Sequence, residues 1–172
     1  MRQTQPTFGK IHKPKHIAKI LGLKTKDIDT EFPIQEVSTG LPFIMIPLKN
    51  LDAVKQAQSN EYLQLTYFND YNIPLFLFSS DTYEKNNDIN CRMFAHALGI
   101  SEDAATGSAN GCLAAYLCEH EYFDKDLIDL KVEQGYEMGR ESILYLHGEK
   151  TKKGFDIFVG GEVFLIANGE LI

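Results

Sequence analysis

The 172-residue sequence contains 44% hydrophobic residues and carries a net charge of −7 at pH 7, from 24 acidic and 17 basic side chains. A chain of this length and composition is expected to form a single domain over residues 1–172 with a hydrophobic core. The acidic balance argues against nucleic acid as a partner. No apolar run approaches the ~20 residues of a membrane-spanning helix, and the N-terminus lacks the apolar core of a signal peptide. We therefore expect no membrane contact and a cytoplasmic location.

Apolar periodicity and cap residues predict helices and strands along the whole chain. Three short helices are expected: 13–21 with Pro14 in its first turn, 50–57 capped by Asn50, and 59–66 capped by Ser59. Apolar, β-prone runs predict strands at residues 2–4, 34–37, 43–48, 74–79, 89–94, 127–133, 142–147, 155–159 and 162–167. Gly160 and Gly161 are expected to form a two-residue hairpin turn between the last two strands.

A fourth helix is predicted at residues 109–120, and its composition is unusual. Small residues lie around it beside larger apolar ones, and they include Ala109, Gly111, Ala114 and Ala115. A helix that is apolar on most sides is surrounded by other elements rather than laid on a surface. We therefore expect this helix to lie at the centre of the fold.

The segment that leads into this helix, E-D-A-A-T-G-S-A-N-G at residues 102–111, combines acidic and hydroxyl side chains with small residues. The first turn of a helix leaves backbone N–H groups unpaired, and the helix dipole favours negative charge there. A small-residue loop lets a carboxylate or phosphate approach these amides, and Asp103 adds a carboxylate for proton chemistry. The alternative is an ordinary helix start that is capped by Asp103, Thr106 or Ser108.

Further segments in chain order accompany this loop: P-T-F-G at 6–9, V-S-T-G-L-P-F at 37–43, R-M-F-A at 92–95, L-G-I at 98–100 and Q-G-Y-E-M-G-R at 134–140. Together they resemble the phenazine-biosynthesis PhzF family, whose signature runs R-x-F-x-P-x-x-G-x-x-E-D-P-A-T-G-S-A. Members share the diaminopimelate-epimerase-like fold. The resemblance implies an α+β fold in which a strongly bent, barrel-like mixed β-sheet wraps around the central helix at 109–120.

The resemblance also implies an isomerase or epimerase activity. Family members isomerise a small carboxylic acid by moving a proton, with no metal and no organic cofactor. The aspartate matching Asp103 and the serine matching Ser108 line the family's substrate pocket. We therefore expect Asp103 to be catalytic and a small carboxylate substrate to be bound by Thr106, Gly107, Ser108, Ala109, Thr39 and Gly40. A plain strand-to-strand turn is the alternative for Thr39 and Gly40.

The resemblance covers only the C-terminal half of family members. Their principal acid/base, a glutamate near a G-N-P-A motif, and an assisting histidine lie in the N-terminal half, and neither segment occurs here. His96 and Ala104 replace two usual prolines, and the second change is expected to loosen the loop because proline fixes φ. Thr106 stands where cysteine-dependent racemases of this fold carry their nucleophile, which disfavours thiolate chemistry.

Three hypotheses follow for how such a half functions. In the first, a separate polypeptide supplies the N-terminal half and completes a split enzyme. In the second, a homodimer imitates the whole enzyme, so that two Asp103 carboxylates share one site. In the third, the chain is a non-catalytic half-protein or gene fragment that binds a small carboxylate or a protein partner. The histidines and cysteines lack metal-ligand spacing, so no metal is expected.

Overall fold

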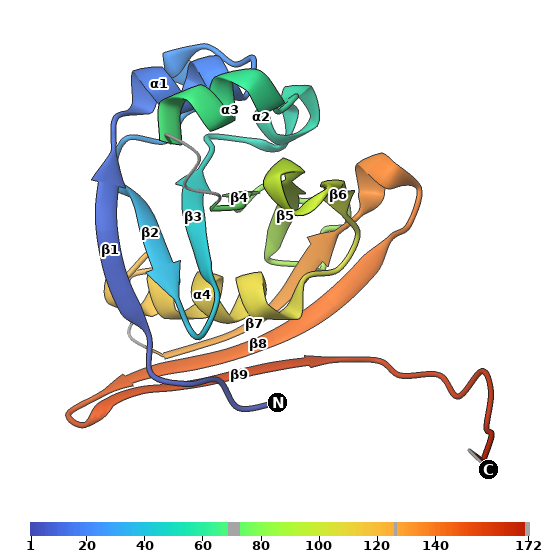
Figure 1. Ribbon diagram of the computed structural model, residues 1–172. Coiled ribbons are helices and arrows are strands. Elements are labelled where there is room, and N and C mark those ends of the chain that lie inside the picture. The colour runs from blue at the N-terminus through green and yellow to red at the C-terminus, as the bar shows by residue number, and fades with distance from the viewer. Residues whose placement is uncertain (69–72, 126, 171–172) are drawn as a thin grey trace.

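The computed structural model describes residues 1–68, 73–125 and 127–170. Figure 1 shows a strongly curled sheet that surrounds one helix and carries the other helices at one end. The helices are α1 (Pro14–Ile20), α2 (Leu51–Gln56), α3 (Glu61–Phe68) and α4 (Gly107–Glu119), with 3₁₀ turns at Thr25–Asp27, His96–Leu98 and Tyr136–Met138. The strands are β1 (Thr7–His12), β2 (Ile34–Ser38), β3 (Pro42–Pro47), β4 (Leu75–Ser79), β5 (Ile89–Ala95), β6 (Ile100–Asp103), β7 (Leu127–Gln134), β8 (Ser142–Thr151) and β9 (Gly154–Gly161).

The sheet is mixed, as the resemblance implies. Among the described residues its strands follow the order β1-β2-β3-β4-β5-β7-β8-β9, and β6 pairs with β5 off this path. β3 and β4 are parallel, as are β5 and β7, and the remaining pairs are antiparallel. The expected α+β fold with a bent mixed sheet around a central helix is therefore confirmed.

Alternating side chains give the sheet two apolar faces, because successive residues of a strand point to opposite sides. On β4, Phe76 and Phe78 belong to the cluster around α4, whereas Leu75 and Leu77 belong to the cluster under α1, α2 and α3. The central strands are therefore covered on both faces. This double coverage explains why the sequence of β4 is a continuous apolar run rather than an alternating one.

Helix α4 lies inside the curl of the sheet, where it contacts β2, β3, β7, β8 and β9. All of its residues from Ala109 to Cys118 are buried. Small residues permit this close approach: a Cβ on Gly111 would lie 2.8 Å from the Gln3 side-chain oxygen. Burial on every side fixes the position of the helix and, with it, the loop that precedes its first turn.

The N-terminal residues pair with the opposite end of the sheet. The Met1 amino group donates to the Val159 carbonyl at 2.6 Å, and the Val159 N–H donates back to Met1 at 2.9 Å. The Gln3 N–H donates to the Ile157 carbonyl at 2.8 Å. The expected strand at 2–4 is thus reduced to a single bridge between Arg2 and Phe158, and β1 begins at Thr7.

The prediction for the last hairpin was wrong. Gly160 and Gly161 continue β9, and residues 162–170 have no regular secondary structure, so the expected strand at 162–167 is absent. The chain reverses earlier, between Thr151 and Gly154, where Gly154 has φ +120° and the Thr151 hydroxyl donates to the Gly154 carbonyl. Lys152 and Lys153 therefore form the turn, and the positive φ of Gly154 starts β9 directly after it.

The predicted helix caps were partly correct. The Asn50 side chain accepts a hydrogen bond from the Ala53 N–H at 2.9 Å, as expected. The α3 helix begins one residue later than predicted, because Asn60 rather than Ser59 accepts from the first turn, at the Leu63 N–H. Among the described residues, no helix is both long and apolar enough to cross a membrane.

Candidate active site

The loop between β6 and α4 holds the Asp103 carboxylate against the start of the central helix. β6 ends at Asp103, and α4 begins at Gly107 with Thr106 as its N-cap residue. The Thr106 side chain makes no capping hydrogen bond. Its hydroxyl instead donates to Asp103 Oδ2 at 2.6 Å. The side-chain cap considered as the alternative is therefore absent, and Thr106 orients the carboxylate.

Gln134, the last residue of β7, holds this loop in place through hydrogen bonds to Asp103 and Thr106. Its Nε2 donates to the Asp103 carbonyl at 2.8 Å and to the Thr106 hydroxyl oxygen at 3.0 Å. Its Oε1 accepts from the Thr106 N–H at 3.1 Å and from Asn110 Nδ2 at 3.0 Å. The side chain is fully buried. Gln134 Nε2 donates to the Thr106 oxygen, so the Thr106 hydroxyl points its own hydrogen toward Asp103. A carboxylate oxygen of Asp103 accepts this hydrogen bond.

Arg92 anchors the strand that carries Asp103. Its guanidinium forms a two-point ion pair with Glu102, at 2.7 and 2.9 Å. Its Nη1 also donates to the carbonyls of Val54 and Ala57 at 2.8 Å each, at the end of α2. A planar guanidinium suits this combination of a fork-shaped acid contact and backbone carbonyls. Arg92 is therefore a structural support of the loop, and it gives Glu102 a structural role too.

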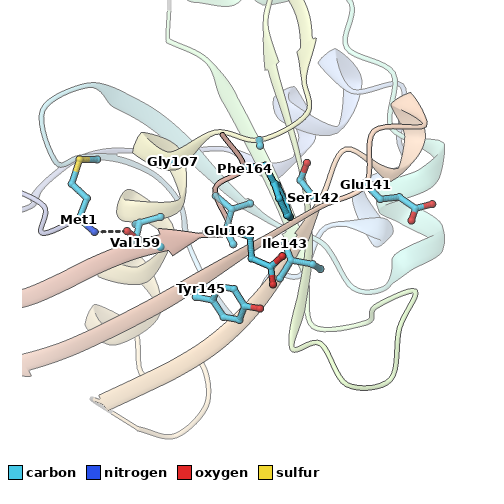
Figure 2. Close-up of a pocket in the computed structure, with 13 residues that line it drawn as sticks. Met1, Gly107, Glu141, Ser142, Ile143, Tyr145, Val159, Glu162 and Phe164 are labelled. Atoms are coloured by element: carbon cyan, nitrogen blue, oxygen red, sulfur yellow. Dashed lines mark hydrogen bonds between the residues drawn. The ribbon is translucent and has the colours of Figure 1, made fainter. Parts of the chain in front are cut away.

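A groove of about 590 Å³ opens beside the start of α4. Figure 2 shows Met1 and Val159 joined by their hydrogen bond on one side of the groove and Glu141 on the other. Ala105 and Gly107 contribute the loop and the first helical turn. The rest of the lining comes from β8, β9 and the segment after β9. A cavity of this size can hold a small organic acid.

Of the predicted site residues, Gly107 alone is among the described residues that line the groove. Asp103 and Ser108 are partly exposed but do not belong to its lining. Ala109 is fully buried in the core, side chain and backbone alike. The hydroxyl and N–H of Thr106 already donate to Asp103 and Gln134. The donors left at this helix start are the backbone of the first turn and the Ser108 hydroxyl.

The predicted turn at Thr39 and Gly40 lies elsewhere along the helix. The Thr39 side chain approaches Cys112, with 3.5 Å between the oxygen and the sulfur, and its carbonyl accepts from the Thr4 hydroxyl at 2.6 Å. Gly40 is exposed with φ +134°. Neither residue lines the groove. Within this chain the two residues form a turn packed on α4, one helical turn beyond Ser108.

The cysteines lie in the core. Burial raises the pKa of the Cys91 thiol well above its usual value, and burial also raises the pKa of Cys112. Both thiols therefore stay protonated near neutral pH, and a protonated thiol is a poor nucleophile.

Sequence reasoning missed Gln134 as a site residue. The Q-G-Y-E-M-G-R segment was noted, but nothing local in it indicates that the glutamine reaches a loop 28 residues away. Gly135, the next residue, lies very close to the loop that carries Asp103. It has φ +85°, and a Cβ at this position would lie 2.7 Å from the Ala104 carbonyl and would also collide with the Arg140 carbonyl. Only glycine lets β7 end so close to the Asp103 loop.

Comparison with known proteins identifies the family and agrees with the fold. The sequence pattern of the family described as "Phenazine biosynthesis-like protein" (PhzC-PhzF) matches residues 1–169. An uncharacterized isomerase of Clostridium acetobutylicum is 29% identical, over 100% of this chain and 59% of its own. Trans-2,3-dihydro-3-hydroxyanthranilate isomerase of Pseudomonas fluorescens is 31% identical, over 87% of this chain and 49% of its own.

The solved structure of a Bacillus anthracis phenazine biosynthesis protein of the PhzF family superimposes with a TM-score of 0.82 at 29% identity, over 94% of this chain and 56% of that one. The curled sheet around one buried helix is the architecture that this chain shares with that PhzF-family structure. The chain belongs to the phenazine biosynthesis-like, or PhzF, family. It spans about half the length of the curated relatives it matches.

Proposed function

We propose that this protein takes part in the cofactor-independent isomerisation of a small carboxylic acid by proton transfer. The observation that carries the proposal is the Asp103 carboxylate, which Thr106 and Gln134 hold at the start of a buried helix. A carboxylate oriented in this way can accept or deliver a proton when a substrate lies within hydrogen-bond reach. Membership of a family with isomerase relatives supports the same chemistry.

In this proposal the substrate carboxylate binds at the first turn of α4. The N–H groups of Gly107 and Ser108 and the Ser108 hydroxyl supply hydrogen bonds, and the helix dipole favours the negative charge. The Thr106 hydroxyl donates its hydrogen bond to Oδ2 of Asp103, which leaves Oδ1 for the substrate. In this proposal Oδ1 either accepts a hydrogen bond from an amine or hydroxyl of the substrate or carries the proton. No metal or organic cofactor takes part.

We further propose that a second polypeptide completes the site. The relatives have additional chain that this sequence does not match. The resemblance assigns the family's glutamate acid/base to that part. A proton-transfer isomerase needs one group to remove a proton and a second position to return it. Asp103 alone provides one of these, and the partner would provide the other.

The test is capture of the tagged protein from its source cells under native conditions, with identification of bound proteins and measurement of the mass of the intact complex. We expect a bound polypeptide whose sequence aligns with the part of the relatives that this chain does not match. Recovery of the chain alone, or only with itself, would contradict the split-enzyme proposal. The non-catalytic half-protein would then be the better description.

A further inference from the structure

Arg92, which anchors the strand that carries Asp103, lies close to two carboxylates. Its Nε and Nη2 donate to Glu102 at 2.7 and 2.9 Å. Oε2 of Glu137 lies 3.8 Å from the same Nε, close enough for an ion pair but too far for a hydrogen bond. Both carboxyl side chains are largely buried. Because a guanidinium has a single Nε–H, the two acids compete for the same donor.

Glu137 has an oxygen that would gain from this competition. Its Oε2 is buried and has no hydrogen-bond partner among the described residues. A buried carboxylate oxygen without a donor is costly, and a move toward Arg92 would satisfy it. The position of Glu137 therefore depends on what holds its other oxygen.

The Tyr83 hydroxyl holds that other oxygen. It donates to Glu137 Oε1 at 2.9 Å. Burial and the Glu137 carboxylate raise the pKa of Tyr83, so the hydroxyl keeps its proton near neutral pH and remains a donor. The ring stacks on Tyr136, with 4.6 Å between the ring centroids, and Lys55 Nζ lies 4.2 Å from the Tyr83 centroid. These ring contacts fix the direction in which the hydroxyl points.

A buried carboxylate fixes the backbone around Tyr83, which lies in the loop between β4 and β5. The Glu133 side chain is fully buried and accepts from the N–H groups of Tyr83 and Glu84 at 2.9 and 2.8 Å. The side-chain amides of Asn87 and Asn90 donate to the same carboxylate at 2.8 and 3.1 Å. Four donors on one carboxylate hold the loop firmly against the end of β7.

These contacts connect Tyr83 to Asp103 along two routes. One route runs through the competing acids and Arg92 to Glu102, the residue before Asp103 on β6. The other route runs through the end of β7, where successive side chains point to opposite faces of the sheet. There Glu133 holds the Tyr83 loop, and Gln134 donates to the Asp103 carbonyl. Tyr83 is thereby part of the framework that sets the position of Asp103.

We propose that the Tyr83 hydroxyl is a positioning group for Asp103. It holds Glu137 away from Arg92, and Arg92 therefore keeps its two-point contact with Glu102. This inference rests on the proposed function, because it concerns the carboxylate assigned to proton transfer. Without the hydroxyl, both oxygens of Glu137 would lack a donor, and Glu137 would take the Nε–H of Arg92. The end of β6 would then lose its anchor, and Asp103 would shift.

The first test follows the Nε–H of Arg92 in the purified chain by ¹H–¹⁵N NMR. Tyr83→Phe keeps the stacked ring and removes only the hydroxyl. We expect the Nε–H signal to shift by more than its line width, because the group changes its acceptor. In a Glu137→Gln background the same change should leave the signal in place, since an uncharged amide does not compete with Glu102. An unchanged signal in Tyr83→Phe, or an equal shift in the Glu137→Gln background, would overturn the inference.

The second test measures proton transfer with the protein recovered natively from its source cells. Deuterium incorporation from D₂O into the small carboxylic acids of a source-cell extract gives the rate. We expect Tyr83→Phe to lower this rate about tenfold, because a small misplacement of a reacting group is enough for such a loss. In the Glu137→Gln background the same change should alter the rate by less than about twofold. Tyr136→Phe, which removes the hydroxyl of the stacked ring, is the matched control and should keep the wild-type rate.

The outcomes separate this inference from the proposal on which it rests. No incorporation by wild type would contradict the proposed function and would remove the inference with it. Incorporation by wild type that Tyr83→Phe leaves unchanged would overturn the inference alone. A loss that persists in the Glu137→Gln background would also overturn it, since Tyr83 would then act by a route other than Arg92.

Discussion

At the scale of single residues, the Thr106 hydroxyl distinguishes this helix start from an ordinary one. It donates to the Asp103 carboxylate and makes no capping hydrogen bond. Thr106→Val keeps the shape and removes the hydrogen bond to Asp103 Oδ2. We expect turnover by the complete enzyme to fall about 100-fold, because a small misplacement of a reacting group is enough for such a loss. Thr106→Ser should restore most of the activity. Equal turnover by the valine and serine variants would show that the hydroxyl does not orient the carboxylate.

Gln134 is the residue on which the loop depends for stability. Gln134→Leu would remove the partner of the Thr106 N–H and one hydrogen bond each from the Asp103 carbonyl and the Asn110 amide, although Asn110 keeps its bond to the Thr106 carbonyl. Each buried polar group that loses its partner costs about 1–3 kcal/mol, so we expect the free energy of unfolding to fall by about 3 kcal/mol or more. Urea denaturation measures this loss. Lys131→Gln, on an exposed side chain of the same strand, should stay within about 0.5 kcal/mol of wild type.

The residue scale also shows what sequence reasoning can and cannot find. Asp103 was identified because its surroundings in sequence, small residues before a helix, carry their own physical meaning. Gln134 was not, since its role depends on the pairing of β5 with β7, which brings Cys91 opposite Gln134. The same limit applies to Thr39, whose contact with Cys112 depends on the packing of a turn against α4. Contacts between distant segments leave no local signal.

At the scale of elements, the end of β7 is shaped by two glycines that differ in their surroundings. Gly135 and Gly139 have φ +85° and +64°, but only at Gly135 would a Cβ meet the Ala104 and Arg140 carbonyls. Gly139→Ala should cost about 1–2 kcal/mol for the backbone conformation alone. Gly135→Ala adds a collision with the Asp103 loop, so it should be clearly more destabilising. Equal midpoints of thermal unfolding for the two variants would contradict this account of the packing.

Elements with a strong local signal were predicted well, and the errors have physical causes. The apolar runs of β4 and β5 and the small-residue helix α4 were found close to their true bounds. The last hairpin was misplaced, since Gly160 and Gly161 are typical turn residues but the β8–β9 pairing continues through them to Gly161. The run at 162–167 has the composition of a strand, but none of the described strands pairs with it.

For the whole molecule, the buried His12 and the half-buried His120 predict a loss of stability on mild acidification. Burial lowers the pKa of His12, although Glu36 opposes this effect, and burial also lowers the pKa of His120. Unfolding returns both to about 6.5, so below that pH the unfolded state binds more protons than the folded state. The free energy of unfolding should therefore fall as the pH drops from 7.5 to 5.5.

Urea denaturation at these two pH values checks this prediction, with a His12→Gln, His120→Gln double variant as the comparison. Glutamine keeps a hydrogen-bonding group beside Glu36 and beside Gln35, the partners of the two histidines. The variant should lose less stability between pH 7.5 and 5.5 than wild type does. An unchanged pH dependence would mean that other groups control the acid response of the fold.

The whole molecule is a curled sheet around one buried helix, with one oriented carboxylate in the loop at the start of that helix. The most direct measurement is deuterium incorporation from D₂O into the small carboxylic acids of a source-cell extract, with the captured complex as catalyst. We predict that wild type adds deuterium to at least one carboxylic acid and that a complex carrying Asp103→Asn does not. Equal incorporation by the two complexes, or none by wild type, would contradict the proposed function.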